Sequence, residues 1–154
     1  MEHITLPALD EARQKVETRE VLEATAGPGG TFTLLHSPAL VDGLAGGDTI
    51  QLAPDLLCGF RLVQRGHNVA VVLVLRSAEE KAAEGTRALL AEVAGLGATC
   101  DGGPHQMLVF TVPVGKAFGA LEAAFDGFCQ RTAGATWWFG NVYGADGKPL
   151  NWWR

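Results

Sequence analysis

The first half of the chain alternates apolar and polar residues over short runs that glycine and proline interrupt. Thr31–His36 alternates with a period of two, and the pattern recurs in Thr49–Leu52 and Phe60–Arg65. A period of two is typical of a strand with one buried face. Glu20–Ala24 mixes apolar and charged residues in a similar alternation. Residues 16–66 are therefore expected to form several short strands in a small, barrel-like or curled sheet.

The second half carries longer apolar runs. Val69–Leu75 is apolar throughout, as in a strand that is buried on both faces. Residues 82–96 have apolar side chains at helical spacing, and Ser77 with Glu80 matches the capping-box pattern that starts a helix. Met107–Val112 predicts another long strand.

The remaining elements complete a recognisable order. A helical apolar stripe predicts a second helix over 118–128, and short strands are expected at Ala98–Cys100 and Thr136–Tyr143. The order from residue 68 is thus strand, helix, strand, strand, helix, strand. This order is typical of a ferredoxin-like fold, in which two helices cover one face of an antiparallel sheet.

Together these patterns predict an α+β protein. Residues 1–154 are expected to form a single compact unit, since this length suits one domain. Within it we expect a strand-rich half at 16–66, a ferredoxin-like half at 68–143 and an aromatic C-terminal tail at 144–154. The barrel-like half should pack on the ferredoxin-like half, because the seam at Gly66–Asn68 is too short for independent motion.

Charge and composition narrow the class of partner. The chain has 12 Lys and Arg against 17 Asp and Glu, so its formal charge of -5 disfavours binding to nucleic acid. The predicted central strands also lack the stacking aromatics of an RNA-recognition motif, apart from Phe110. No apolar run approaches the roughly 20 residues that span a bilayer, and no secretory signal precedes the strands. We therefore expect a cytoplasmic protein with no nucleic-acid or membrane partner.

The residues that most often carry catalysis or metals are widely spaced. Cys58, Cys100 and Cys129 form no paired motif, and the four histidines are likewise isolated, so we expect no metal and no cofactor. Neither Ser37 nor Ser77 lies in a nucleophile elbow. The preferred interpretation is a non-enzymatic protein without catalytic residues, with a Cys–His pair formed by folding as the open enzymatic alternative.

The aromatic tail is the most unusual feature of the sequence. All the tryptophans lie in the last 18 residues: Trp137, Trp138, Trp152 and Trp153. Because neighbours in a strand point to opposite faces, only one tryptophan of each pair is expected to face the core. Asp146–Gly147 is a hairpin signal between the pairs. The tail therefore either seals the sheet or forms a partner-binding surface.

Acidic turns favour the second interpretation. Partner-binding candidates are the acidic residues Asp42, Asp48, Asp55 and Asp146, together with the four tryptophans. Negative charge speeds the association of an inhibitor with a basic target. The leading hypothesis is an immunity-type inhibitor that neutralises a cognate bacterial toxin, such as a basic nuclease, by occluding its active surface. A homodimer formed through exposed sheet edges is left open.

A second hypothesis places a small ligand at the start of the first helix. Arg76 and Ser77 follow a buried strand, and the helix amides beside them could hold an anion. This arrangement would suit a regulatory ferredoxin-like domain that senses amino acids. Ligand-induced thermal stabilisation would distinguish it from an inhibitor.

Turn residues carry a resemblance to a known group of proteins. Glu20, Pro38 and the run Gly43–Asp48 (Gly-Leu-Ala-Gly-Gly-Asp) follow one another at characteristic positions, and Gly66–His67 and Leu96–Gly97 continue the pattern. In these features the chain resembles a bacterial domain-of-unknown-function family of small proteins. The resemblance implies a strand-rich first half and a ferredoxin-like second half, with no established activity and no catalytic residues to transfer.

Overall fold

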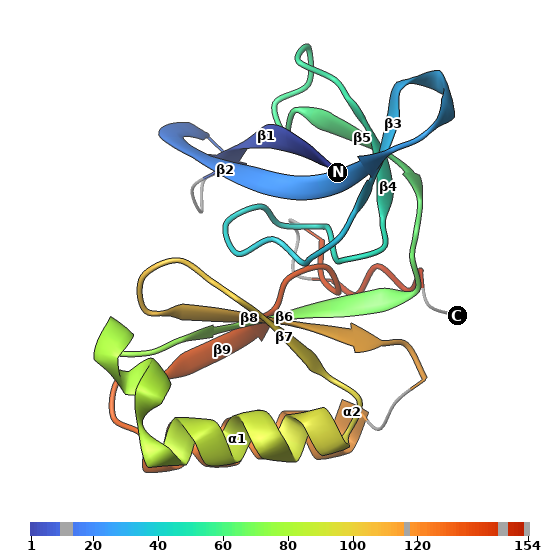
Figure 1. Ribbon diagram of the computed structural model, residues 1–154. Coiled ribbons are helices and arrows are strands. Elements are labelled where there is room, and N and C mark those ends of the chain that lie inside the picture. The colour runs from blue at the N-terminus through green and yellow to red at the C-terminus, as the bar shows by residue number, and fades with distance from the viewer. Residues whose placement is uncertain (10–13, 116–117, 145–147, 153–154) are drawn as a thin grey trace.

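The structure, a computed structural model, consists of two antiparallel sheets that lie one above the other (Figure 1). It describes residues 1–9, 14–115, 118–144 and 148–152. The first sheet contains β1 (Glu2–Leu9), β2 (Lys15–Ala26), β3 (Thr31–Leu34), β4 (Thr49–Leu52) and β5 (Phe60–Gln64). The second contains β6 (Asn68–Val74), β7 (Thr99–Gly102), β8 (Met107–Pro113) and β9 (Thr136–Phe139). The helices are α1 (Glu84–Gly95), α2 (Phe118–Arg131) and the short 3-10 helices η1 (Pro28–Gly30) and η2 (Ala78–Ala82).

The first sheet is a meander in which each strand pairs with the next along the chain, in the order β1-β2-β3-β4-β5. No pairing between β1 and β5 occurs among the described residues, so this sheet is not a closed barrel. Its core is formed by apolar side chains from alternate strand positions and the following loop: Ile4, Leu6, Leu22, Ala24, Leu34, Val41, Leu44 and Ile50. The predicted period of two therefore describes this half correctly.

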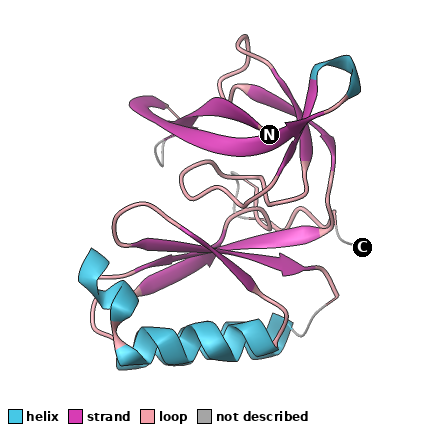
Figure 2. Cartoon of the chain, viewed as in Figure 1, coloured by secondary structure: helices cyan, strands magenta, loops and turns pink. Residues whose placement is uncertain are grey.

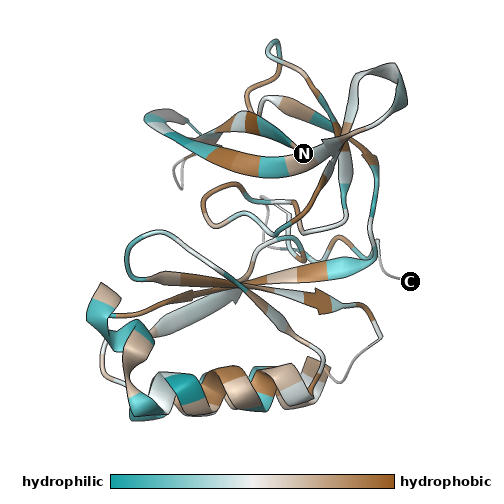
Figure 3. Ribbon diagram, viewed as in Figure 1, coloured by the Kyte–Doolittle hydropathy of each residue, from teal (hydrophilic) through white to brown (hydrophobic). Residues whose placement is uncertain are grey.

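The second sheet has the order β7-β8-β6-β9, with every neighbouring pair antiparallel. Numbered within this half the order is 2-3-1-4, which is the ferredoxin-like arrangement, and both helices cover the same face (Figure 2). Apolar and polar residues alternate along α1 in Figure 3, because one stripe of the helix packs on the sheet. The predicted α+β class is confirmed.

The central strand β6 is buried on both faces, as its apolar sequence predicted. Val71 and Leu73 pack with the helices in the larger core. On the opposite face, Ala70 and Val72 lie against Gly140, and both side chains are at most 2% exposed. Figure 1 shows the β3–β4 loop and the segment after β9 lying between the two sheets. These segments cover the face of the second sheet that the helices leave open.

Three elements differ from the sequence-based expectation. Residues 2–9, for which no strand was expected, form β1, and β2 extends well beyond Glu20–Ala24. The segment Asp10–Lys15, whose sequence is compatible with a short helix or with a flexible lead-in, falls mainly outside the described residues. β9 ends at Phe139 rather than Tyr143, because the Asn141 side chain, not the backbone, accepts the Ala70 N–H at 2.9 Å and ends the ladder.

The expected capping box is wrong. The helix α1 begins at Glu84 with Ala83 as its N-cap, and no side chain caps it. Ser77 instead precedes η2 and makes no side-chain cap. The carboxylate of Glu80 accepts the Arg76 N–H at 3.4 Å and pairs with the Arg76 guanidinium at 3.0 Å. The acidic residue of the motif is therefore bound to Arg76 and is not available to Ser77.

Candidate functional site

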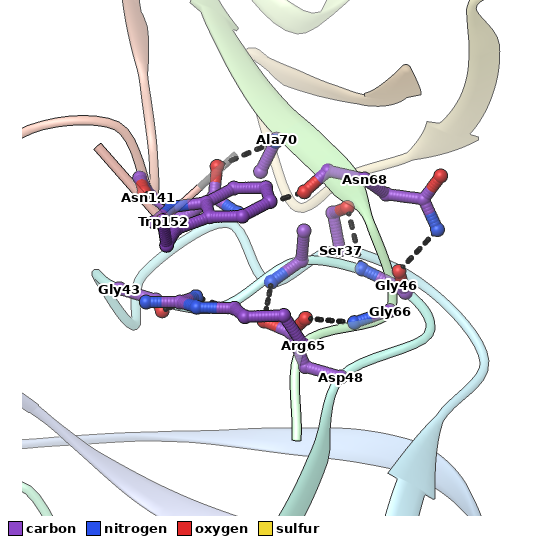
Figure 4. Close-up of polar contacts among 11 residues, drawn as sticks. Ser37, Gly43, Gly46, Asp48, Arg65, Gly66, Asn68, Ala70, Asn141 and Trp152 are labelled. Carbon is purple, nitrogen blue, oxygen red and sulfur yellow. Dashed lines mark hydrogen bonds and ion pairs between the residues drawn. The ribbon is translucent and has the colours of Figure 1, made fainter. Parts of the chain in front are cut away.

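A buried polar network fixes the turn at which the chain passes from the first sheet to the second (Figure 4). The Asp48 side chain is fully buried, and its carboxylate accepts the N–H groups of Ala45 at 3.0 Å and Gly66 at 2.8 Å. The same carboxylate pairs with the Arg65 guanidinium at 3.1 Å, which also donates to the Gly43 carbonyl at 2.7 Å. One carboxylate therefore holds the β3–β4 loop and the β5–β6 connection together.

Burial dominates the electrostatics of this carboxyl. It raises the pKa of Asp48 above the ordinary value, while the hydrogen bonds from Gly66 and Ala45 and the charge of Arg65 act in the opposite direction. Chain packing also restricts this point, since a Cβ on Gly66 would lie 2.3 Å from the Gly47 carbonyl carbon. The connection thus requires both a buried acid and glycine.

Side chains from the second sheet complete the junction. Asn68 donates its amide to the Gly46 carbonyl at 2.7 Å, and Asn141 donates to the Asn68 carbonyl at 3.0 Å. The Gly46 N–H in turn donates to the Ser37 hydroxyl at 2.9 Å. The Ser37 hydroxyl is 2.6 Å from that of Thr111 on β8. These bonds connect the β3–β4 loop to the second sheet at several separate points.

Beside this junction an open cleft of about 330 Å³ separates β2 from the end of β7. Its lining residues are Glu20, Val21, Leu22, Glu23, His36, Ser37, Ala39, Asp101, Gly102, Gly103, Pro104 and Val109. The cleft therefore has one wall from each half of the molecule. The junction contacts hold the two walls at a fixed separation.

The titratable groups in the cleft are mainly acidic. The His36 imidazole lies between two carboxylates, with Nε2 3.3 Å from Glu23 Oε2 and Nδ1 3.6 Å from Asp101 Oδ1. The Glu20 carboxylate accepts the N–H groups of Ala39 and Leu40, each at 2.8 Å. The Glu23 side chain is 42% exposed, whereas that of Asp101 is only 6% exposed.

Nucleophiles near the cleft are engaged in structural bonds. Thr111 donates its hydroxyl proton to Asp101 Oδ2 at 2.5 Å, so its oxygen receives the proton of the Ser37 hydroxyl. Ser37 therefore has no hydrogen bond to a histidine base of the kind that activates a serine. Burial raises the pKa of the thiols of Cys100 and Cys129, which disfavours the reactive thiolate.

The predicted acidic candidates occupy different environments. Asp48 is buried in the junction, so its carboxylate does not reach the surface. Asp42 is exposed and lines a groove that Arg65 also borders. Asp55 is exposed and pairs with Arg61 at 3.2 Å. Asp146 lies outside the described residues.

The tryptophans likewise separate into different roles. Trp137 stacks on Phe125 at 5.3 Å between ring centroids, and its indole N–H donates to Asp126 at 2.8 Å. Its neighbour Trp138 is 40% exposed, which confirms that adjacent residues of this strand point to opposite faces. Trp152 donates its indole N–H to the Asn141 carbonyl at 2.9 Å, and its ring lies 4.9 Å from the Arg65 guanidinium carbon (Figure 4).

The predicted hairpin signal Asp146–Gly147 lies outside the described residues. Tyr143 and Pro149 form an isolated antiparallel bridge, and the Gly144 N–H donates to the Lys148 carbonyl. Trp137 and Trp152 lie in different environments, because Trp137 packs against the helix-side core and Trp152 lies against Arg65. Trp153 lies outside the described residues.

The alternative ligand residues, Arg76 and Ser77, do not line the cleft. Arg76 is ion-paired with Glu80, and Ser77 is followed by η2 rather than by a long helix. The N-terminus of α1 begins at Glu84, so its amides are separated in sequence from Arg76 and Ser77.

Sequence reasoning missed the cleft residues Glu23, His36 and Asp101. They are far apart in the chain and belong to no local motif. Only Glu20 gave a signal, through its place in the family resemblance, and its hydrogen bonds to the loop amides supply a structural reason for a carboxylate there.

Two further findings concern metal sites and membrane-spanning helices. Within the part of the chain that the structure describes, no group of three His, Cys, Asp or Glu side chains could hold a metal ion. No helix over these same residues has the length and apolar character needed to cross a membrane.

Comparison with known proteins identifies the fold and the family. A solved structure titled as a hypothetical protein from Neisseria gonorrhoeae is 16% identical and has a TM-score of 0.70. The similarity covers 90% of this chain and 93% of that one, and at this identity it shows the fold alone. No curated protein matches the sequence. The family model for a domain of unknown function, DUF4265, matches residues 20–138, which is most of the chain, and the protein therefore belongs to this family.

Proposed function

We propose that this protein is a non-enzymatic, protein-binding protein of the immunity type, which neutralises a cognate basic toxin by covering its active surface. The observation that carries the proposal is the open acidic cleft between the two sheets. Three carboxylates line it, those of Glu20, Glu23 and Asp101, and the His36 imidazole lies among them.

The rigidity of the cleft supports a binding role. Its walls are connected by the bond from the Ser37 N–H to Asp101 at 3.0 Å, and the hydrogen bonds of Glu20 to the loop amides tie β2 to the β3–β4 loop on one side of it. A surface that is already ordered loses less conformational entropy when a partner binds. We therefore infer that the cleft binds with little rearrangement of this chain.

Charge supports a basic partner. The chain carries a formal charge of -5, and Glu23 presents an exposed carboxylate at the cleft. An acidic surface attracts a basic protein over a distance and raises the association rate. Val21, 62% exposed beside Glu23, adds an apolar contact at the same place. Specific interfaces bury about 800 Å² on each partner, so the cleft would be the centre of a larger contact.

The described side chains favour binding over catalysis. Ser37 and Thr111 are engaged in the hydrogen bonds that connect the halves, and burial raises the pKa of Cys100 and Cys129. The cysteines are free, and free thiols persist in a reducing compartment. We accordingly place the protein in the cytoplasm as part of this proposal.

A growth assay tests the proposal. Each reading frame adjacent to the gene is expressed in a bacterial host, alone and together with this protein. We expect one frame to arrest growth alone and to be tolerated when the wild-type protein is present. The Glu23→Lys variant should lose this protection, while Glu92→Lys, an equal charge change on an exposed position of α1, should keep it. Absence of a toxic frame, or protection that survives Glu23→Lys, would contradict the proposal.

A further inference from the structure

The strand β2 is much longer than its neighbour on one side. It extends over 12 residues and pairs with β1 along most of this length, but β3 reaches only Ala24–Ala26. One further bond, from the Leu35 N–H to the Glu23 carbonyl at 3.0 Å, extends this pairing. Before Glu23, no strand among the described residues pairs with the β3-facing edge of β2.

The register shows which backbone groups lie on this open edge. In an antiparallel strand, the N–H and C=O of alternate residues point to the same side. Since the Glu23 carbonyl points toward β3, the backbone groups of Val21 and Arg19 point the same way. Because the Arg19 backbone points away from β1, Arg19 and its β1 partner Pro7 form a pair without hydrogen bonds between them. Pro7 has no N–H and therefore fits this pair. Among the described residues, no loop or side chain hydrogen-bonds to the Val21 backbone on this side.

The open edge of β2 forms one wall of the acidic cleft. Four consecutive residues of β2, 20–23, line the cleft, as do residues 101–104, which span the end of β7 and the start of the β7–β8 turn. Since neighbouring side chains of a strand point to opposite faces, a consecutive run is expected where the edge of the strand borders the space. In Figure 1 the β7–β8 turn lies below β2. β7 is itself an edge strand of its sheet, so the cleft separates two sheet edges.

The charges around this edge favour a basic binding partner. Glu20, Glu23 and Asp101 face the cleft, with the His36 imidazole between the latter two. A cation, the ammonium of Lys81, lies at the far end and donates to the Gly103 carbonyl at 2.8 Å. The carboxylates therefore outnumber the cations at the cleft, which complements a strand that carries lysine or arginine.

We propose that an extended, basic segment of the partner protein adds to β2 as an additional strand, hydrogen-bonding to the backbone of Arg19 and Val21 while its cationic side chains contact Glu23. This inference rests on the proposed function, for which it supplies the mode of binding. Strand addition gives affinity through main-chain bonds, and the side chains on the cleft-facing side give specificity.

Binding of a model peptide tests the pairing directly. The probe is a short peptide of alternating lysine and valine, and its control has the same sequence with alternate backbone amides N-methylated, which removes donors but keeps the charge. We expect the first peptide to bind in calorimetry and to slow hydrogen exchange at Val21 and Arg19, and the methylated peptide to do neither. Equal binding of the two peptides, or exchange protection elsewhere only, would overturn the inference.

A matched pair of proline variants gives a second test. Val21→Pro removes an N–H from the open edge of β2, and Thr5→Pro, at the cross-strand partner position, removes one from the outer edge of β1. Only Val21→Pro should weaken peptide binding, with circular dichroism showing that both variants fold. If either variant unfolds, the N-methylated peptide decides the question. Toxin protection that Glu23→Lys abolishes and Val21→Pro preserves would leave the proposed function intact and refute strand addition.

Discussion

Replacement of Asp48 by asparagine tests whether the buried junction holds the two sheets together. The carboxylate accepts three hydrogen bonds, from the Ala45 and Gly66 N–H groups through different oxygens and from the Arg65 guanidinium. An asparagine of the same size has one oxygen and one NH₂ group in their place. In Asp48→Asn, the new NH₂ group therefore faces another donor at one of these contacts. Arg65, whose side chain is mostly buried, also loses its carboxylate partner.

The size of the effect follows from these contacts. Removing one partner of a buried ion pair costs about 3–5 kcal/mol. Two features reduce this cost. First, burial raises the pKa of Asp48, which shows that burying this charge is unfavourable, and the uncharged asparagine avoids that cost. Second, Arg65 keeps its bond to the Gly43 carbonyl and its contact with Trp152. We expect Asp48→Asn to lower the free energy of unfolding by about 3 kcal/mol, a large part of the total stability of a domain.

Urea unfolding, followed by tryptophan fluorescence, measures this change as a shift of the midpoint at constant slope. The matched control is Asp55→Asn, which breaks the Asp55–Arg61 pair, whose side chains are both more than half exposed. Exposed pairs contribute at most about 1 kcal/mol, so the control should move the midpoint little. Equal shifts for the two variants would refute the assigned role of the junction.

The other predictions concern packing and reactivity. Gly66→Ala should destabilise the fold by about 3 kcal/mol in the same urea assay, because the new Cβ would meet the Gly47 backbone; a neutral effect would show that the junction is loosely packed. Trp137→Ala should lower the free energy of unfolding by about 3 kcal/mol and Trp138→Ala by less than about 1 kcal/mol, since Trp137 packs against the core and Trp138 is exposed. A larger loss of thermal stability in Trp138→Ala than in Trp137→Ala would contradict these positions. Alkylation of Cys100 by iodoacetamide, followed by mass spectrometry, should be slower than that of free cysteine near neutral pH and should accelerate as pH rises toward the raised pKa of this thiol. A fast reaction at neutral pH would show that the pKa of Cys100 is not raised.

The sequence predicted best those elements whose pattern has one physical cause. Val69–Leu75 is apolar throughout because β6 is covered by helices on one face and by the β3–β4 loop on the other. The stripe of α2 was predictable because Leu121, Phe125 and Phe128 all face the sheet. β1 was missed, although Ile4 and Leu6 alternate with polar residues, because Pro7 interrupts so short a run. Proline is tolerated there since the strand lies at the sheet edge.

The candidate site was much less predictable than the fold. Asp48 was chosen as a surface acid because turns are ordinarily exposed, yet the β3–β4 loop lies between two sheets and its carboxylate is buried. His36 and Asp101 meet at the junction of the two halves, where Ser37, the neighbour of His36, donates its N–H to Asp101. No periodicity along the chain encodes a contact of this kind between the two halves.

The rate at which the protein associates with the proposed toxin partner, measured by stopped-flow fluorescence at increasing ionic strength, tests the acidic cleft most directly. For the wild type and for Glu92→Lys, we expect fast association that slows steeply as salt is added, because salt screens the attraction between the partners. Glu23→Lys should associate more slowly and depend less on salt. If Glu23→Lys associates as fast as the wild type at every ionic strength, the partner does not bind through the cleft.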